Sequence, residues 1–177
     1  MMVLVIGGSG SGKSFYAEDM ALSLAKAGMK KYYLATMQIY DEEGRRKVKK
    51  HRKLRDGKGF TTIEQPTEIA GAVEKMEEGE KTVLLECISN LAANEMFAEE
   101  EPKTEVQTAE NIINGIKLIK EKASNLVVVS NNVFEDGEAY DETTMEYIQA
   151  MGRINMELAK LADKVVEVVA GIAVRIK

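Results

Sequence analysis

Short apolar runs alternate with longer mixed stretches along this chain of 177 residues. Continuous apolar runs are typical of strands that are buried on both faces of a sheet. They predict strands over residues 2–6, 31–36, 60–63, 82–86, 126–131 and 165–169. The stretches between them predict helices over residues 13–27, 42–55, 67–76, 89–97, 105–122 and 143–161.

This alternation predicts an α/β fold with a mostly parallel sheet and helices on both of its faces. Residues 172–176 follow the last long strand across Gly171 and predict a terminal hairpin, which adds an antiparallel strand. We expect one domain over residues 1–177, since this length suits a single core. Ligands of open α/β sheets bind beyond the carboxyl ends of the strands, so the loops after residues 6, 35, 86 and 131 should line one site.

The strongest chemical signal is the loop after the first strand. It matches the pattern G-x-x-x-x-G-K-[ST] and lies between a predicted strand and a predicted helix, as phosphate-binding loops do. Its glycines allow successive backbone N–H groups to point into one concavity, and the following helix adds its positive end. Lys13 can reach the β- and γ-phosphates, and the Ser14 hydroxyl can hold Mg²⁺. The loop consists of Gly7, Gly8, Ser9, Gly10, Ser11, Gly12, Lys13 and Ser14.

A second signal is the acidic residue Glu86, which follows the apolar run Val83-Leu84-Leu85. A carboxylate at the end of a buried strand is the arrangement that binds Mg²⁺, directly or through water, beside a phosphate-binding loop. An acid at a strand end is common by chance, and this position is usually Asp. The loop described above is what favours a metal-binding role for Glu86.

The third signal is a densely basic segment, residues 45–58, which contains the only histidine, His51. On a helix, Val48, His51 and Leu54 share one face. The segment has three interpretations: a solvated basic helix, a surface for an anionic polymer, or a triphosphate-facing segment with a functional imidazole. In the third, neighbouring cations disfavour the protonated ring, and a neutral imidazole can attack phosphorus.

Composition argues against a nucleic-acid-binding, a membrane-spanning or a disulfide-bonded protein. The net charge is −5, which argues against general nucleic-acid binding. No stretch approaches the roughly 20 apolar residues of a membrane span, and the apolar start of the chain is expected to be a core strand rather than a signal peptide. The single cysteine, Cys87, excludes an intramolecular disulfide and fits a reducing cytoplasm. We expect Cys87 to be a small core residue, because no basic partner for a reactive thiol is evident.

The motifs together resemble the bifunctional adenosylcobinamide kinase / adenosylcobinamide-phosphate guanylyltransferase family of cobalamin biosynthesis. The resemblance covers nearly the whole chain. Its most particular parts are the histidine segment and the C-terminal ending. The motifs that carry it are residues 7–14, Tyr33-Leu34-Ala35-Thr36 with Gln38, Lys50-His51-Arg52-Lys53-Leu54-Arg55, Leu84-Leu85-Glu86-Cys87, Val129-Ser130-Asn131, Gly152-Arg153-Ile154-Asn155, Ala162-Asp163 and residues 171–177.

The resemblance implies a RecA-like, three-layer P-loop NTPase fold and two activities. One phosphorylates a hydroxyl on adenosylcobinamide, and the other transfers GMP from GTP to the resulting phosphate through a covalent guanylyl-histidine. By position the histidine is His51, and Lys13 is the second catalytic residue. Mg²⁺ as cofactor, GTP or ATP as substrate, a homotrimer and a cytoplasmic location are implied as well. Beside residues 7–14, the implied nucleotide-binding residues are Thr36, Met37, Gln38, Arg52, Lys53, Leu54, Arg55, Glu64 and Glu86, with Ser14 and Glu86 at the metal.

The chain departs from the family pattern after residue 131. The family has Asn-Glu-Val-Gly, whereas this chain has Asn131-Asn132-Val133-Phe134, so that a carboxylate and a glycine are missing. No Asn-Lys-x-Asp signature for guanine is present. Two alternatives stay open from the sequence: a plain P-loop small-molecule kinase with a structural His51, and a nucleotide-binding regulatory protein without turnover.

Overall fold

The computed structural model describes residues 1–38, 57–98, 101–132 and 140–177. In this part of the chain one sheet of seven strands has the order β3-β2-β4-β5-β1-β6-β7. All neighbouring pairs are parallel except β6 and β7. The strands are β1 (Met2–Gly7), β2 (Lys30–Ala35), β3 (Phe60–Glu64), β4 (Lys81–Glu86), β5 (Asn125–Asn131), β6 (Lys164–Val169) and β7 (Ile172–Arg175).

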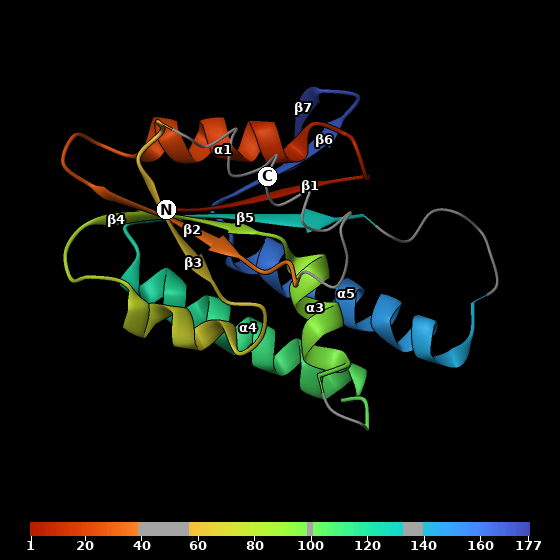
Figure 1. The fold of residues 1–177 in the computed structure, drawn as a ribbon. Coiled ribbons are helices and arrows are strands. Elements are labelled where there is room, and N and C mark those ends of the chain that lie inside the picture. The colour runs from red at the N-terminus through yellow and green to blue at the C-terminus, as the bar shows by residue number, and fades with distance from the viewer. Residues whose placement is uncertain (39–56, 99–100, 133–139) are drawn as a thin grey trace.

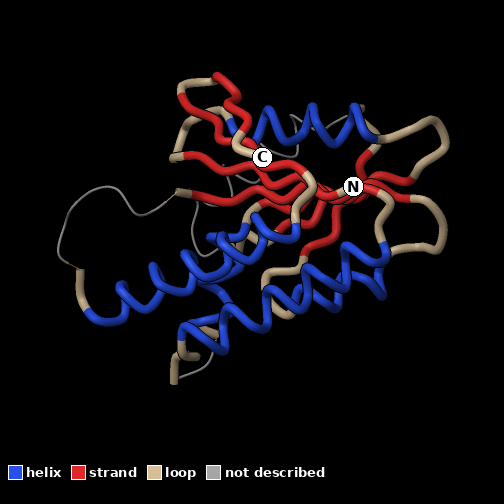
Figure 2. The backbone as a smooth tube through the Cα atoms, turned by 180° about the vertical axis from the view of Figure 1, so that it is seen from behind, coloured by secondary structure: helices blue, strands red, loops and turns tan. Residues whose placement is uncertain are grey.

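Helices cover both faces of this sheet and complete three layers (Figures 1 and 2). Of the described helices, α1 (Lys13–Leu24) lies by itself on one face. The other face carries α3 (Ile88–Met96), α4 (Glu105–Lys122), α5 (Glu142–Leu161) and the 3₁₀ helix η1 (Ile69–Lys75). The predicted α/β fold, with its mostly parallel sheet and C-terminal hairpin, is therefore confirmed. The helix predicted over residues 42–55 lies outside the described residues.

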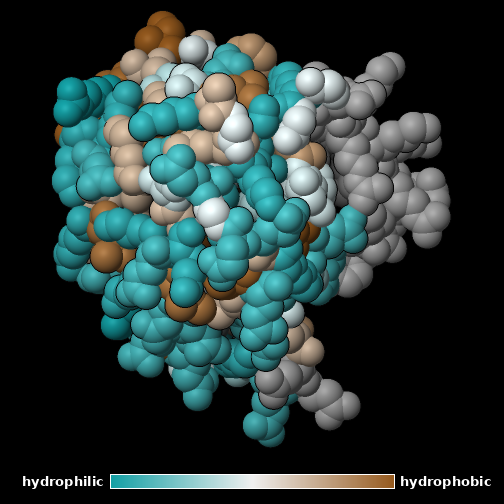
Figure 3. Space-filling model, turned by 90° about the vertical axis from the view of Figure 1, so that its left-hand side faces the viewer, coloured by the Kyte–Doolittle hydropathy of each residue, from teal (hydrophilic) through white to brown (hydrophobic). Residues whose placement is uncertain are grey.

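Alternate residues of the central strands divide the core between the two faces. On β1, Val3 and Val5 pack in the cluster under α1, whereas Met2 and Leu4 pack in the larger cluster under α4 and α5. All four side chains have no exposed surface. This explains the unbroken apolar runs in the sequence, since both sides of a central parallel strand are covered. The end of the molecule at the amino ends of the strands is largely hydrophilic (Figure 3).

Two predicted helices end or wind differently in the structure. Helix α1 ends at Leu24 rather than at residue 27, because Asn125 at the start of β5 donates to the Leu24 carbonyl at 3.0 Å and Ala25 turns to an extended conformation. The helix predicted over 67–76 is instead η1, with i→i+3 bonds from Gly71 N to Glu68 O and from Met76 N to Val73 O. Its start is fixed from outside, since the Glu68 backbone N–H donates to the buried carboxylate of Glu95.

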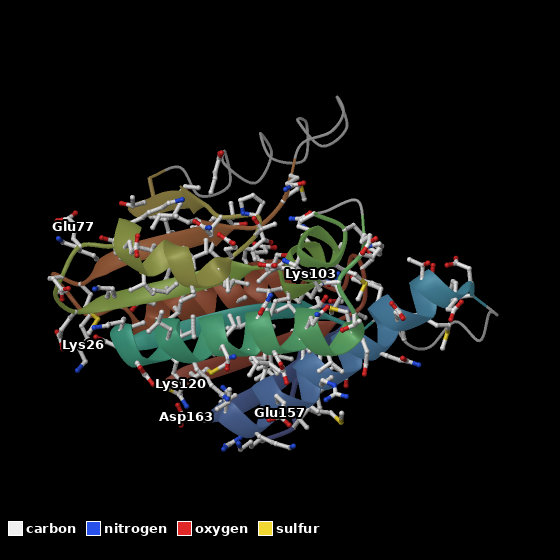
Figure 4. All side chains as sticks on the ribbon, turned by 90° about the horizontal axis from the view of Figure 1, so that it is seen from below. Lys26, Glu77, Lys103, Lys120, Glu157 and Asp163 are labelled. Carbon is white, nitrogen blue, oxygen red and sulfur yellow. The ribbon has the colours of Figure 1, made fainter. Side chains whose placement is uncertain are left out.

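The C-terminal residue closes the end of α5. The Lys177 ammonium group donates to the carbonyls of Ala162 at 2.6 Å, Ala159 at 3.1 Å and Lys160 at 3.2 Å. The last carbonyls of a helix have no partner within the helix, and a cation there also complements the helix dipole. Nearby, Asp163 accepts a hydrogen bond from the Met2 backbone N–H at 2.6 Å, which lowers the pKa of this carboxyl. Figure 4 labels Asp163 and shows Lys120 close by.

Two helical glycines provide a matched test of how closely η1 packs against α4. A Cβ added to Gly115 on α4 would lie 2.5 Å from Ile69 Cγ2 and 3.1 Å from Ala70 N on η1, whereas one added to Gly152 on α5 would have no neighbour within 4 Å. We therefore expect Gly115→Ala to lower the free energy of unfolding by about 1–3 kcal/mol through overpacking. Gly152→Ala should raise it by up to about 1 kcal/mol, because alanine loses less entropy in a helix. Urea unfolding measures both, and equal effects would contradict the close approach of η1 to α4.

Candidate nucleotide-binding site

The glycine-rich loop connects the end of β1 to the start of α1. Gly10 and Gly12 have φ angles of 72° and 91°, a region that side-chained residues rarely adopt. Gly7 is needed for space, because a Cβ there would lie 2.6 Å from both Ser11 Oγ and the Val168 carbonyl of β6. Gly8, Ser9, Gly10 and Gly12 are exposed, and Ser14 is half-buried in the first turn of α1. The loop therefore packs against β6 at Gly7, and its other glycines are exposed to solvent at the positive end of helix α1.

The turn of the C-terminal hairpin supports this loop from the side. The Gly171 backbone N–H donates to the Ser11 carbonyl at 2.8 Å, and a Cβ on Gly12 would lie 3.4 Å from Gly171 Cα. The hairpin is at the other end of the sequence from the loop and is its neighbour in space. The residues of this turn therefore shape the loop without belonging to its motif.

Lys13 is folded over the loop. Its side chain is buried, with 8% exposed, and its Nζ donates to the Gly8 carbonyl at 2.9 Å. Burial lowers the pKa of Lys13, and the negative charge of Glu86 acts in the opposite direction, as the thiolate form of Cys87 would. Glu86, at the end of β4, is therefore near enough to Lys13 for their charges to interact.

Glu86 is held at the end of β4 by the neighbouring strand β2. The Tyr33 hydroxyl donates to Glu86 Oε2 at 2.9 Å, and the Thr36 backbone N–H donates to the Glu86 carbonyl at 3.2 Å. A carboxylate and the hydroxyl of Ser14 are hard oxygen ligands, which suits Mg²⁺ that is bound mainly by phosphates and water. No cluster of three or more His, Cys, Asp or Glu side chains that could hold a metal by itself occurs among the described residues.

Thr36 is completely buried and locks the ends of β2 and β4 together. Its hydroxyl donates to the Cys87 carbonyl and accepts from the Cys87 backbone N–H, both at 2.8 Å. The next residues, Met37 and Gln38, are half-buried and continue beyond the strand end. Of the three residues predicted to contact nucleotide after β2, Thr36 therefore has its hydroxyl engaged by the protein in this structure.

Cys87 is near enough to Lys13 for a thiolate there to interact with the ammonium charge, a relation that the sequence did not reveal. Its Sγ is 3.0 Å from Ser89 Oγ. Burial raises the pKa of the Cys87 thiol, and the Ser89 hydrogen bond and the Lys13 charge only partly oppose that rise. The sequence predicts a small core residue, but Cys87 is half-buried against the core rather than fully within it, and the pKa shift agrees with a thiol that is not activated.

A polar network joins the end of β5 to helices α3 and α5. Asn131 Nδ2 donates to Ser89 Oγ at 2.7 Å, and Asn155 Nδ2 donates to the Asn131 carbonyl at 3.3 Å. The Tyr147 hydroxyl donates to the Ser89 carbonyl at 3.2 Å, and burial raises the pKa of Tyr147 to about 12. Asn131 is also the register partner of Gly7 at the start of the glycine loop.

Helix α3 fixes the loops that follow β2 and β3. Asn94 Nδ2 donates both to the Thr36 carbonyl at 2.7 Å and to the Pro66 carbonyl at 2.9 Å. The adjacent Glu95, which is 2% exposed, accepts from Lys103 at 3.3 Å (Lys103 is labelled in Figure 4) and from the Glu68 backbone. Sequence analysis missed these residues, because a side chain that binds backbone groups of distant loops leaves no local pattern.

The remaining predicted residues lie elsewhere. Glu64 ends β3, an outer strand that is separated from β1 by β2, β4 and β5. With adjacent strands about 4.8 Å apart, the ends of β3 and β1 are about 19 Å apart, so Glu64 and Lys13 are too far apart to hold the same phosphate group. His51, Arg52, Lys53, Leu54 and Arg55 fall outside the described residues, as does Phe134.

The strand order and the loop define a class of protein, the P-loop nucleotide-binding proteins of RecA-like fold. Solved structures with this fold include the KaiC-like protein PH0186 from the hyperthermophilic archaeon Pyrococcus horikoshii OT3, with a TM-score of 0.52 and 13% identity over 94% of this chain and 69% of that one. A second solved structure, an ATPase domain, has a TM-score of 0.51 and 10% identity over 94% of this chain and 68% of that one. At these identities the likeness concerns the fold alone.

Within this class, residues 3–176 match the model of the family described as cobinamide kinase / cobinamide phosphate guanyltransferase. The chain belongs to this family. It is 30% identical, over the full length of both chains, to the bifunctional adenosylcobalamin biosynthesis protein CobU of Escherichia coli K12. It is 25% identical to the bifunctional adenosylcobalamin biosynthesis protein CobP of Pseudomonas aeruginosa, over all of this chain and 98% of that one.

The raised pKa of Cys87 predicts a slow thiol. At pH 8 the native protein should react with iodoacetamide about tenfold or more slowly than the urea-unfolded chain, because only the thiolate attacks and burial disfavours it. Since Cys87 is the single cysteine, mass spectrometry of the intact protein follows it alone. Equal rates in the native and unfolded protein would show that the thiol is neither buried nor suppressed.

Proposed function

We propose that this protein phosphorylates adenosylcobinamide and then transfers GMP from GTP to adenosylcobinamide phosphate. The observation that supports this most is the combination of family membership over nearly the whole chain with a preformed glycine-rich loop, in which Lys13 donates to the Gly8 carbonyl and interacts electrostatically with Glu86. The product would be adenosylcobinamide-GDP. GTP or ATP would be the phosphate donor of the first step.

In the first step, the loop from Gly7 to Ser14 binds the triphosphate through its backbone N–H groups, and Lys13 leaves the Gly8 carbonyl to pair with the β- and γ-phosphates. Ser14 and Glu86 would hold Mg²⁺, which would offset the charge of the transferring group. The cobinamide hydroxyl oxygen bonds to the γ-phosphorus as the bond to the β-phosphate oxygen breaks. A nucleoside diphosphate leaves, and the hydroxyl proton is lost.

In the second step, the imidazole of His51 attacks the α-phosphorus of GTP and expels pyrophosphate. A phosphate oxygen of adenosylcobinamide phosphate then attacks the phosphorus of this phosphoramidate and releases the histidine. The covalent route divides one difficult displacement into two easier ones. Arg52, Lys53, Leu54 and Arg55 line the nucleotide in this proposal, with Arg55 as a charge clamp. Glu64, which is remote from the loop, is assigned to the guanosine part rather than to the triphosphate tail.

We infer from the resemblance that the protein is a homotrimer in the cytoplasm. No helix in the described ranges has both the length and the apolar character needed to cross a bilayer. Sedimentation equilibrium tests the assembly, since one chain has a mass of 19.6 kDa and a trimer three times that value.

Two other functions remain as outcomes of the tests. A plain P-loop small-molecule kinase would use the loop and leave His51 in a structural role. A nucleotide-binding regulatory protein without turnover is favoured by one observation, the replacement of the family acid and glycine by Asn132 and Phe134. Turnover with adenosylcobinamide would exclude the regulatory protein.

Replacing the loop lysine tests the first step. Lys13→Ala should reduce triphosphate affinity and lower kcat/KM for both activities by about 100-fold or more, since the cation that offsets the charge of the β- and γ-phosphates is removed. Radiolabelled phosphate transfer to adenosylcobinamide measures this loss. Retained kinase turnover in the folded variant would show that the loop is not where the phosphates bind.

The guanylyl intermediate is tested with α-labelled GTP and Mg²⁺. Wild-type protein should acquire an acid-labile, alkali-stable label, as expected for a phosphoramidate. His51→Asn should lose both this label and GMP transfer, yet phosphorylate adenosylcobinamide at a rate close to that of wild type. Active wild-type protein that never acquires the label would favour the plain kinase. Equal loss of both activities in the variant would mean that His51 supports the fold.

A further inference from the structure

The buried tyrosine Tyr33 lies next to the carboxylate of the candidate site. Tyr33 is 5% exposed, packs in the core under α1, and its hydroxyl donates to Glu86 Oε2 at 2.9 Å. The register pairs Tyr33 with Leu84 and Ala35 with Glu86, so that Tyr33 and Glu86 lie on the same face of the sheet. That face also carries α1, whose first residue is Lys13.

This hydrogen bond restricts an acidic side chain that is longer than usual for this position. The usual acid at this strand end is Asp, and Glu is longer by one methylene group and therefore has one more rotatable bond. A free glutamate would lose more conformational entropy when it is fixed in one orientation. The hydroxyl of the packed Tyr33 ring fixes one carboxylate oxygen of Glu86 before a ligand binds. Because the carboxylate is rigid, the orientation of its other oxygen is then fixed as well.

We propose that Tyr33 is a positioning residue for Glu86: its hydroxyl holds Oε2 and so presents Oε1 to the cation that accompanies the phosphates at the glycine loop. Tyr33 itself contacts neither. The inference rests on the proposed function only in that a metal–triphosphate complex binds at the loop. It adds a residue that acts through the acid to the set expected from the sequence.

A purely structural role makes a different prediction. A buried tyrosine hydroxyl needs a partner in any protein, so Tyr33→Phe could affect stability alone. Tyr32 is the matched control, because it is the preceding residue of β2, is 3% exposed and has its hydroxyl bonded as well. That hydroxyl accepts from the Glu77 backbone N–H at 3.0 Å, and Glu77 lies at the opposite end of the sheet (Figure 4). Tyr32→Phe therefore removes a comparable buried hydroxyl away from the site.

The primary experiment measures binding, not turnover. Fluorescent mant-GTP is titrated with Mg²⁺ in the wild type, Tyr33→Phe and Tyr32→Phe. We expect Tyr33→Phe to raise the half-saturating Mg²⁺ concentration about 10-fold or more, as for the loss of a hydrogen bond to a charged group, and to leave metal-free nucleotide binding unchanged. Tyr32→Phe should match the wild type in both. Equal Mg²⁺ dependence in the two variants would overturn the proposal, whatever their stabilities.

A double-variant test shows whether Tyr33 acts through Glu86. In a Glu86→Gln background, which keeps the side-chain volume and removes the charge, adding Tyr33→Phe should change the half-saturating Mg²⁺ concentration by no more than about threefold. A full additional loss would mean that Tyr33 acts by another path, and would overturn the proposal. If the wild type binds Mg²⁺–mant-GTP but does not phosphorylate adenosylcobinamide, the proposed function fails and this inference is still decided by the titration.

Discussion

The close approach of the β6–β7 hairpin to the glycine-rich loop is the constraint on which the candidate site depends. At Gly7 the strand, the loop and β6 come so near that a single methyl group would lie 2.6 Å from a backbone carbonyl. On the other side, the Ser11 carbonyl accepts the Gly171 N–H. Within the loop the Ser11 backbone N–H donates to the Gly8 carbonyl at 3.2 Å, but N–H groups that face an anion cannot add further internal bonds, so the loop also needs support from its neighbours. The C-terminal hairpin supplies that support.

Polar contacts connect the carboxyl ends of the strands around this loop. Thr36 joins β2 to β4, Asn94 joins the loops after β2 and β3, and Ser89 with Asn131 joins α3 to the end of β5. Hydrogen bonds are directional, whereas apolar contacts are not, so a polar frame fixes the orientation of the groups it carries. Such a frame suits a site that must present a lysine and a carboxylate to the same ligand, since small displacements of either group weaken charge stabilisation.

Glu64, one of the residues expected at the site, lies far from the glycine-rich loop. Glu64 ends a strand four places from β1, and the phosphate-binding loop cannot reach it. In a protein with a phosphate-binding loop and two proposed transfer reactions, residues far along the sheet are suited to the nucleoside rather than to the phosphates. The order of the strands in the sheet sets the distance between Glu64 and the glycine-rich loop, and their separation in the sequence does not reveal it.

Much of the fold follows from the sequence, because its signals are local. Helix α4 begins and ends where the pattern predicts, since Thr104 and Gln107 form a capping box and a run of buried isoleucines lies on one face. The unbroken apolar strands indicate a sheet covered on both sides, and the glycine loop is identified by its own spacing. Likewise, Glu86 is predicted from the strand that precedes it. Such features depend on residues a few positions apart, so they can be recognised without knowledge of the tertiary structure.

Contacts between residues far apart in the chain could be learned only from the folded structure. Asn125 binds the Leu24 carbonyl, where α1 ends. Glu95 accepts a hydrogen bond from the backbone at the start of η1, which is a 3₁₀ helix rather than an α-helix. Tyr33 on β2 donates to Glu86 on the adjacent strand β4. Each of these depends on which strands become neighbours, and strand order is set by the packing of the whole chain. The sequence determined which elements form and which loop can bind phosphate; the tertiary structure determined which side chains orient the groups of that site.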